Sequence, residues 1–128
     1  MKTTLKGMRK IIIKGELPDL NTYINAERGN RYAGANIKKE ATEMVQWSVN
    51  GQQSIVGQII VKFTWYTKNE RKDPDNVAFA KKFILDGLVR SGVLIDDTRK
   101  FIKGFMDEFD IDEANPRVEI EFIRHETH

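Results

Sequence analysis

The sequence contains no cysteine, only three prolines and no apolar run longer than four residues. The lack of cysteine excludes a disulfide framework, a zinc site with thiolate ligands and a cysteine nucleophile. The short apolar runs exclude a membrane-spanning helix and the apolar segment of a secretory signal, so we expect a cytoplasmic protein. With 128 residues, of which 40% are hydrophobic and 31% charged, the chain fits one globular domain over residues 1–128.

The formal net charge of only +2 conceals an uneven distribution along the chain. Residues 1–103 carry 19 basic and 11 acidic side chains, whereas residues 104–128 carry two basic and eight acidic ones. An excess of basic residues gathered on one face attracts the phosphates of nucleic acids. The distribution therefore favours a nucleic-acid partner, although a solvated surface of mixed charge gives a similar count.

The order of apolar, polar and turn residues predicts an α+β fold, with a small mixed or antiparallel sheet and two main helices. Between frayed chain ends, we expect strands over residues 10–15, 54–67, 101–109 and 117–124, and helices over 37–49 and 76–91. Asn36 and Asp75 are the expected N-caps of the two helices. Residues 21–36 are rich in asparagine, glycine and arginine and are expected to form a long ordered loop.

The densest group of polar residues is Arg71-Lys72-Asp73-Pro74-Asp75-Asn76. Pro74 favours an extended conformation at Asp73, and residues two apart in an extended chain point to the same side, so Asp73 and Asp75 can converge. The plain structural alternative is a turn at Asp73-Pro74 followed by a helix cap at Asp75.

Further polar residues follow on the predicted helix and after it. At 100° per residue, Lys82 and Asp86 lie close to the stripe that begins at Asp75, away from the apolar face. Asp97 joins them if the connection through Ile95 returns to the N-terminal end of the helix. Several carboxylates in one place need a hard cation, and oxygen-rich clusters without cysteine suit Mg²⁺ or Mn²⁺. The alternatives are a surface ion pair between Lys82 and Asp86 and a simple turn at Asp96-Asp97.

Residues 72–97, KDPDNVAFAKKFILDGLVRSGVLIDD, strongly resemble the signature of the RusA-like crossover-junction endodeoxyribonucleases. In that signature an Asp-x-Asp-Asn leads into a helix bearing a lysine and Leu-Asp-x-Leu, followed by a glycine and Asp-Asp. The upstream segment Leu17-Pro18-x-x-Asn21-x-Tyr23 is also similar to this family. The resemblance implies a Mg²⁺-dependent homodimer that resolves Holliday junctions in DNA recombination and repair, often encoded by a phage or prophage.

The resemblance also implies roles for individual residues. Asp73, Asp75 and Asp97 match the metal-binding carboxylates, and Lys82 matches the catalytic lysine. The interval from Asp75 to Lys82 is about three residues longer than in the best-known form of the family, so Lys81 remains an alternative. Asp86 and Asp96 match acidic positions of the signature without an assignable role.

Hydrolysis of a phosphodiester builds negative charge on the phosphoryl oxygens and on the departing oxygen, which metal ions and a lysine can stabilise. DNA binding needs other residues, because carboxylates without metal repel phosphates. The best candidates for contacts to the DNA backbone are Arg28, Arg31, Tyr32, Lys38, Lys39, Arg71 and Lys72. We expect Trp47 and Trp65 to lie in the core.

Two other functions compete with a junction endonuclease. One is a DNA-binding recombination accessory protein that has the fold but does not cut, and the other is a metal-dependent phosphohydrolase acting on small nucleotides. The complete set of three acids and one lysine favours the endonuclease, since a protein without activity would tolerate their loss.

Overall fold

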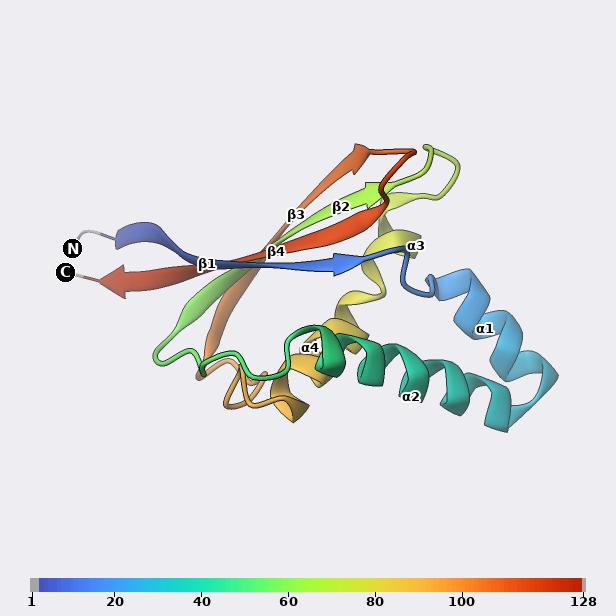
Figure 1. Ribbon diagram of the computed structural model, residues 1–128, viewed down its shortest axis with the longest axis horizontal. Coiled ribbons are helices and arrows are strands. Elements are labelled where there is room, and N and C mark those ends of the chain that lie inside the picture. The colour runs from blue at the N-terminus through green and yellow to red at the C-terminus, as the bar shows by residue number, and fades with distance from the viewer. Residues whose placement is uncertain (1–2, 128) are drawn as a thin grey trace.

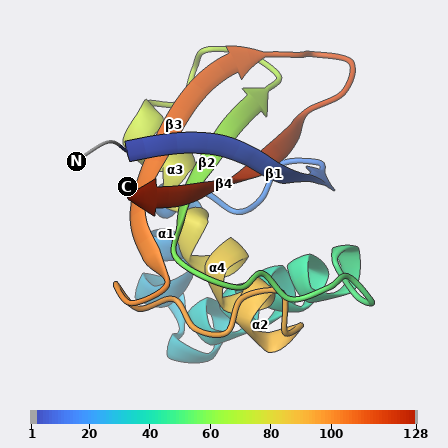
Figure 2. The same ribbon diagram turned by 90° about the vertical axis from the view of Figure 1, so that its left-hand side faces the viewer.

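The computed structural model describes residues 3–127, with side chains from Arg9 to Arg124, as a four-stranded sheet with helices on one face (Figures 1 and 2). The strands are β1 (Thr3–Lys14), β2 (Ile59–Thr67), β3 (Ile102–Ile111) and β4 (Arg117–Thr127). Their order is β1-β4-β2-β3; β4 is antiparallel to both β1 and β2, and β2 is parallel to β3. The sheet is therefore mixed, and the predicted α+β class is confirmed.

The core lies between the sheet and the helices. Along β2, Val61, Phe63 and Trp65 are buried and alternate with more accessible residues, as the period of a strand requires. On β4, Val118 and Ile120 face the same core, as their alternation with glutamates predicts. The strand pattern was thus readable from the sequence.

The chain ends and Trp47 differ from the expectation. Residues 3–9 and 125–127 do not fray, because they pair with each other at the outer ends of β1 and β4; residues 1, 2 and 128 lie outside the described part. Trp65 is 2% exposed, as predicted, but Trp47 is 76% exposed on a helix surface. No helix in the described range 3–127 has the length and apolar character needed to cross a membrane.

The long loop predicted for residues 21–36 is wrong, since two helices occupy this region. Helix α1 (Leu20–Gly29) is capped by Asp19, whose side chain accepts a hydrogen bond from the Thr22 N–H. Helix α2 (Arg31–Ser48) is capped by Asn30, so Asn36 lies inside the helix instead of capping it. Each cap satisfies a free N–H in the first turn, which outweighs the weak helix propensity of asparagine and glycine.

The predicted helix over residues 76–91 is interrupted. Helix α3 (Pro74–Ala78) and helix α4 (Lys81–Arg90) are joined at Phe79-Ala80. There the N–H of Lys82 bonds the carbonyl of Phe79 at 3.2 Å, three residues back instead of four. Residues 76–91 therefore form two helices joined by a tighter turn, whereas the prediction of a stripe from Asp75 to Asp86 assumed one uniform helix.

Helices α2 and α4 pack closely because Gly87 has no side chain. A Cβ placed there would lie 2.6 Å from the Cβ of Val45 and 2.9 Å from the backbone oxygen of Thr42. Only glycine allows the two backbones to approach this closely. This contact fixes α2 beside the C-terminal half of α4.

Candidate functional site

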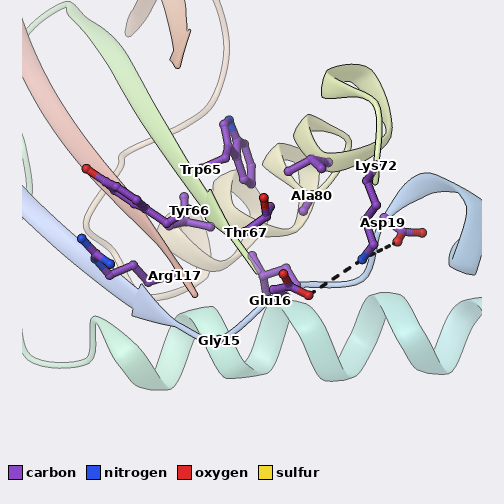
Figure 3. Close-up of a pocket in the computed structure, with 12 residues that line it drawn as sticks. Gly15, Glu16, Asp19, Trp65, Tyr66, Thr67, Lys72, Ala80 and Arg117 are labelled. Carbon is purple, nitrogen blue, oxygen red and sulfur yellow. Dashed lines mark ion pairs between the residues drawn. The ribbon is translucent and has the colours of Figure 1, made fainter. Parts of the chain in front are cut away.

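The turn that carries Asp73 is anchored to the beginning of α1. The Nζ of Lys72 lies 2.8 Å from Oδ2 of Asp19 and 3.9 Å from Oε2 of Glu16 (Figure 3). Asp19 is only 7% exposed, and its other oxygen caps α1. Lys72, which we predicted to bind DNA, is therefore held in an ion pair within its own chain.

The electrostatics of Asp19 follow from these contacts. Burial raises the pKa of its carboxyl, whereas hydrogen bonds from Lys72 and from Thr22 lower it, and the net result is a pKa below the ordinary value. The ionised form of Asp19 is thus favoured in the folded protein, which strengthens the link between the turn and α1.

The two segments of the RusA-like resemblance meet at this point. The backbone N–H of Asn21 donates to Oδ1 of Asn76 at 2.9 Å, although 55 residues separate them. The ring of Tyr23 lies 5.4 Å from that of Phe79 and 6.3 Å from that of Phe83. Residues that the sequence relates only by resemblance therefore form one packed unit around the turn with Asp73 and Asp75.

Asp73 and Asp75 both lie at the beginning of α3. Asp73 occupies the N-cap position predicted for Asp75, with Pro74 as the first helical residue, and its side chain makes no cap hydrogen bond. Asp75 lies in the first turn, where its Oδ1 accepts the N–H of Asn76. Asp73 lines a cleft of about 340 Å³ together with Glu70 and Asp110.

The two candidate lysines point to different partners. Lys82 is exposed and pairs with Asp86 at 3.5 Å, as the alternative of a surface ion pair describes. Lys81 turns toward the sheet, where its Nζ lies 2.7 Å from Oδ2 of Asp107, a carboxylate that also accepts the indole N–H of Trp65. Sequence reasoning missed this pair because nothing in the spacing indicates that β3 lies beside α4.

Asp97 lies at the other end of the helical segment. The connection after α4 stays beside the C-terminal half of the helix, because the N–H of Leu94 bonds the carbonyl of Leu88. Asp97 lines a cleft of about 530 Å³ between α2 and α4, which we call the α2–α4 cleft. The condition that this connection returns to the N-terminal end of the helix is therefore not met.

The acids consequently do not form a metal site within one chain as placed. Among residues 9–124, whose side chains the structure describes, no three carboxylate or histidine side chains come close enough to hold an ion together. Asp73 and Asp97 line different clefts, and Asp86 and Asp97 line the same one. The three carboxylates suit Mg²⁺ by chemical type, but one chain does not supply them as a group.

The remaining predicted DNA-binding residues are exposed. Arg28 ends α1, Lys38 and Lys39 line the α2–α4 cleft, and Arg71 lies in the turn before Asp73. Arg31 begins α2, with its guanidinium 5.0 Å from the ring of Tyr32. Because the helix begins at Arg31, Lys38 lies inside α2 and not at the helix beginning predicted at residue 37.

Four basic residues were overlooked in the sequence. Arg90 lines the α2–α4 cleft beside Lys38 and Lys39. A second cleft of about 440 Å³ is lined by Gln58, Arg99, Lys100, Ile102 and Lys103. The signal was present as Arg99-Lys100-x-x-Lys103 directly after Asp96-Asp97.

In the comparisons with known proteins, the sequence matches no family model and no curated protein.

Proposed function

We propose that this chain is a Mg²⁺-dependent, cytoplasmic endodeoxyribonuclease of the RusA-like type that resolves Holliday junctions as a homodimer. The observation that carries the proposal is the contact between the segment 17–23 and the Asp73-to-Asn76 turn, through Asn21 and Asn76. The resemblance treats these separate segments as one signature. Their packing into one unit supports the relation, since unrelated matches have no reason to meet in space.

The residues of the turn that carries Asp73 have different roles in this proposal. Lys72, Asp19 and Asn76 hold the turn, so that the carboxylates of Asp73 and Asp75 point away from the core. In this proposal Lys82, on the first turn of α4, leaves its exposed ion pair with Asp86 at 3.5 Å to stabilise charge on a bound phosphate. Lys81 is already bonded to Asp107 and therefore ranks second for this role.

Because Asp73 and Asp97 line different clefts of one chain, the proposal includes the assembly of two chains into a dimer. A Holliday junction presents two equivalent strands, so an enzyme with paired cuts uses a two-fold dimer. In such a dimer, Asp97 of a second copy can approach the Asp73 turn of the first. We therefore propose that the metal ligands are shared between two chains.

A second candidate function is a DNA-binding accessory protein that does not cut. The separation of the acids in one chain favours it, because such a protein needs no metal site. The two functions differ in whether a four-way junction is hydrolysed.

The deciding experiment compares four-way, nicked and linear DNA with Mg²⁺ and with EDTA. We expect paired cuts in the four-way junction that need Mg²⁺. Asp73→Asn, Asp75→Asn or Asp97→Asn should each abolish these cuts. Tight binding without cleavage identifies the accessory protein. Hydrolysis of free nucleotides alone identifies a phosphohydrolase.

Mixed dimers test whether the acids are shared. We co-express the Asp73→Asn chain and the Asp97→Asn chain with different tags and purify the mixed dimers. If each site uses both chains, such a mixed dimer retains one intact site. We expect these dimers to nick the junction, while neither variant alone does. Inactive mixed dimers would show that each site is built within one chain.

A further inference from the structure

The α2–α4 cleft has an excess of cations without partners. Within residues 3–127, Lys38, Lys39 and Arg90 make no ion pair or side-chain hydrogen bond, although all three line the cleft. Of its two carboxylates, Asp86 is paired with Lys82 and only Asp97 is unpaired. Side chains of like charge repel one another across a cleft unless an anion lies between them.

The second cleft is still more basic. Its lining includes Arg99, Lys100 and Lys103 and no acidic residue. In the described part of the chain the guanidinium of Arg99 and the ammonium of Lys103 have no partner, and Lys100 lies 5.5 Å from the ring of Phe101. Arg and Lys gathered in this way are typical of surfaces that bind phosphate oxygens.

One ordered loop joins the two clefts. Asp97 lines the first and Arg99, two residues later, lines the second. The backbone between them is fixed by bonds from the N–H groups of Phe101 and Ile102 to the carbonyl of Thr98, both 3.0 Å. The side-chain amide of Gln58 also donates to the carbonyl of Arg99. The two clefts are therefore neighbours along one ordered loop, and we call their six cations together the basic end.

The opposite end of β3 would repel a polyanion. Between residues 107 and 113 the sequence contains five acids, Asp107, Glu108, Asp110, Asp112 and Glu113. Asp107, Glu108 and Asp112 are paired with Lys81, Lys62 and Arg117, so among the described residues Asp110 and Glu113 carry the unpaired negative charge here. Seven residues of strand, or about 23 Å, separate Asp110 from Lys103, which is more than two Debye lengths at physiological salt. A nucleic acid is thus directed to one end of the molecule.

We infer that the basic end binds the DNA backbone at two neighbouring points, one phosphate in the α2–α4 cleft and another at Arg99, Lys100 and Lys103. The inference rests on the proposed function for the identity of the ligand and adds the place where it docks. In this arrangement Asp97 lies between the two phosphate positions, and the Asp73 turn lies outside the docking surface.

The test measures binding without cleavage. We measure the fluorescence anisotropy of a labelled four-way junction and of a labelled linear duplex in EDTA. Titrations at several salt concentrations give the dissociation constant and its salt dependence. Arg90→Met with Lys100→Met removes one cation from each cleft, and Lys38→Met with Lys103→Met repeats the design with other residues. Lys14→Met with Lys68→Met removes the same charge elsewhere and serves as the matched control; both lysines are exposed.

We expect each double substitution at the basic end to weaken DNA binding about tenfold or more. It should also lower the slope of log K against log salt by about two, since each lost phosphate contact lowers this slope by about one. The control pair changes affinity about twofold, with an unchanged slope. Equal effects of all three pairs, or no DNA binding by the unaltered protein, overturn the inference.

The outcomes also separate this inference from the proposed function. Normal junction cleavage with unaffected binding in both basic-end variants refutes the docking surface and leaves the enzyme proposal intact. Docking at the basic end without any cleavage refutes the enzyme proposal and leaves the docking surface intact.

Discussion

At the beginning of α3, Asp73 lies in a cleft with two other carboxylates, whereas beyond the end of α4, Asp97 lies among three cations. The first region is held by contacts to α1, through Lys72 and Asn76. The second is held by α2, through the close approach at Gly87. The two ends of the segment 73–97 are therefore supported by different helices, α1 and α2.

The comparison shows that the segment 72–97, which resembles the RusA-like signature, has two structurally different ends. At the Asp73 end, two nearby cations, Lys72 and Lys81, are paired with Asp19 and Asp107. Among the described residues, the three cations that line the α2–α4 cleft have no partner, and Asp97 is the one carboxylate of that cleft without an ion pair. The proposed docking surface and the acidic pair Asp73 and Asp75 thus lie at different ends of the segment formed by α3 and α4.

The largest expected effect concerns the lysines between the two ends. Under the proposed function, Lys82→Ala should lower turnover on a four-way junction on the order of a hundredfold, because the proposal places this exposed ammonium where it stabilises negative charge in the transition state. Lys81→Ala should lower stability with a much smaller change in turnover, since Lys81 is bonded to Asp107.

Cleavage rates and urea denaturation of both variants separate these effects. The opposite ranking of turnover would transfer the role to Lys81 and would place the reacting phosphate on the β3 side of α4.

The next prediction alters the Asp97 end alone. Gly87→Ala should lower the free energy of unfolding by about 2 kcal/mol, because the new methyl group would lie 2.6 Å from Val45 and forces α2 away from α4. It should also weaken DNA binding, since the α2–α4 cleft changes shape. Gly29→Ala at the end of α1, where a Cβ meets nothing within 4 Å, is the matched control. An unchanged melting temperature in Gly87→Ala would contradict the close approach.

Much of the fold could be predicted from the sequence. The alternation of Val118, Ile120 and Phe122 with glutamates identified β4 and its buried face, and the β-branched run after Gln58 identified β2. The helix predicted over residues 37–49 corresponds to the larger part of α2. Helix α1 and the beginning of α2 were missed because asparagine and glycine are weak helix formers, and the capping bonds of Asp19 and Asn30 depend on three-dimensional geometry.

The candidate site was less predictable, for a physical reason. The expected stripe from Asp75 to Asp86 assumed an unbroken helix, and the structure has a turn at Phe79-Ala80 between two helices. The interval from Asp75 to Lys82, which is about three residues longer than in the family, contains this turn. The extra length was visible in the sequence, but the break in the helix that it contains was not predicted from it. Whether Asp97 approaches Asp73 depends on the path after α4, which local sequence does not determine.

A smaller effect is expected at the Asp73 end. Asp19→Asn keeps a good N-cap for α1 but removes the ion pair with Lys72, so stability at neutral pH should fall by about 1 kcal/mol, given that Lys72 is partly exposed. Because the folded-state pKa of Asp19 is lowered, its contribution is present above about pH 4 and is lost as the pH falls through the folded value.

The difference between the two proteins should therefore shrink below about pH 4, as urea denaturation at several pH values would reveal. Lys68→Met, in the same turn, is the control and should not alter the pH dependence. A constant difference from pH 7 to pH 2 would show that Asp19 does not act through its charge.

The last comparison contrasts a threonine at each end, with expected effects of about 1 kcal/mol or less and of opposite sign. Thr42, on α2 at the α2–α4 cleft, is 3% exposed, and its hydroxyl has no hydrogen-bond partner among the described residues. A buried hydroxyl without a partner is unfavourable, so Thr42→Val should raise the free energy of unfolding by about 1 kcal/mol. Thr22→Val, at the start of α1, should lower it by about 0.5 kcal/mol, because that hydroxyl bonds Asp19. Urea denaturation measures both signs, and destabilisation by Thr42→Val would indicate that water satisfies this hydroxyl within the folded protein.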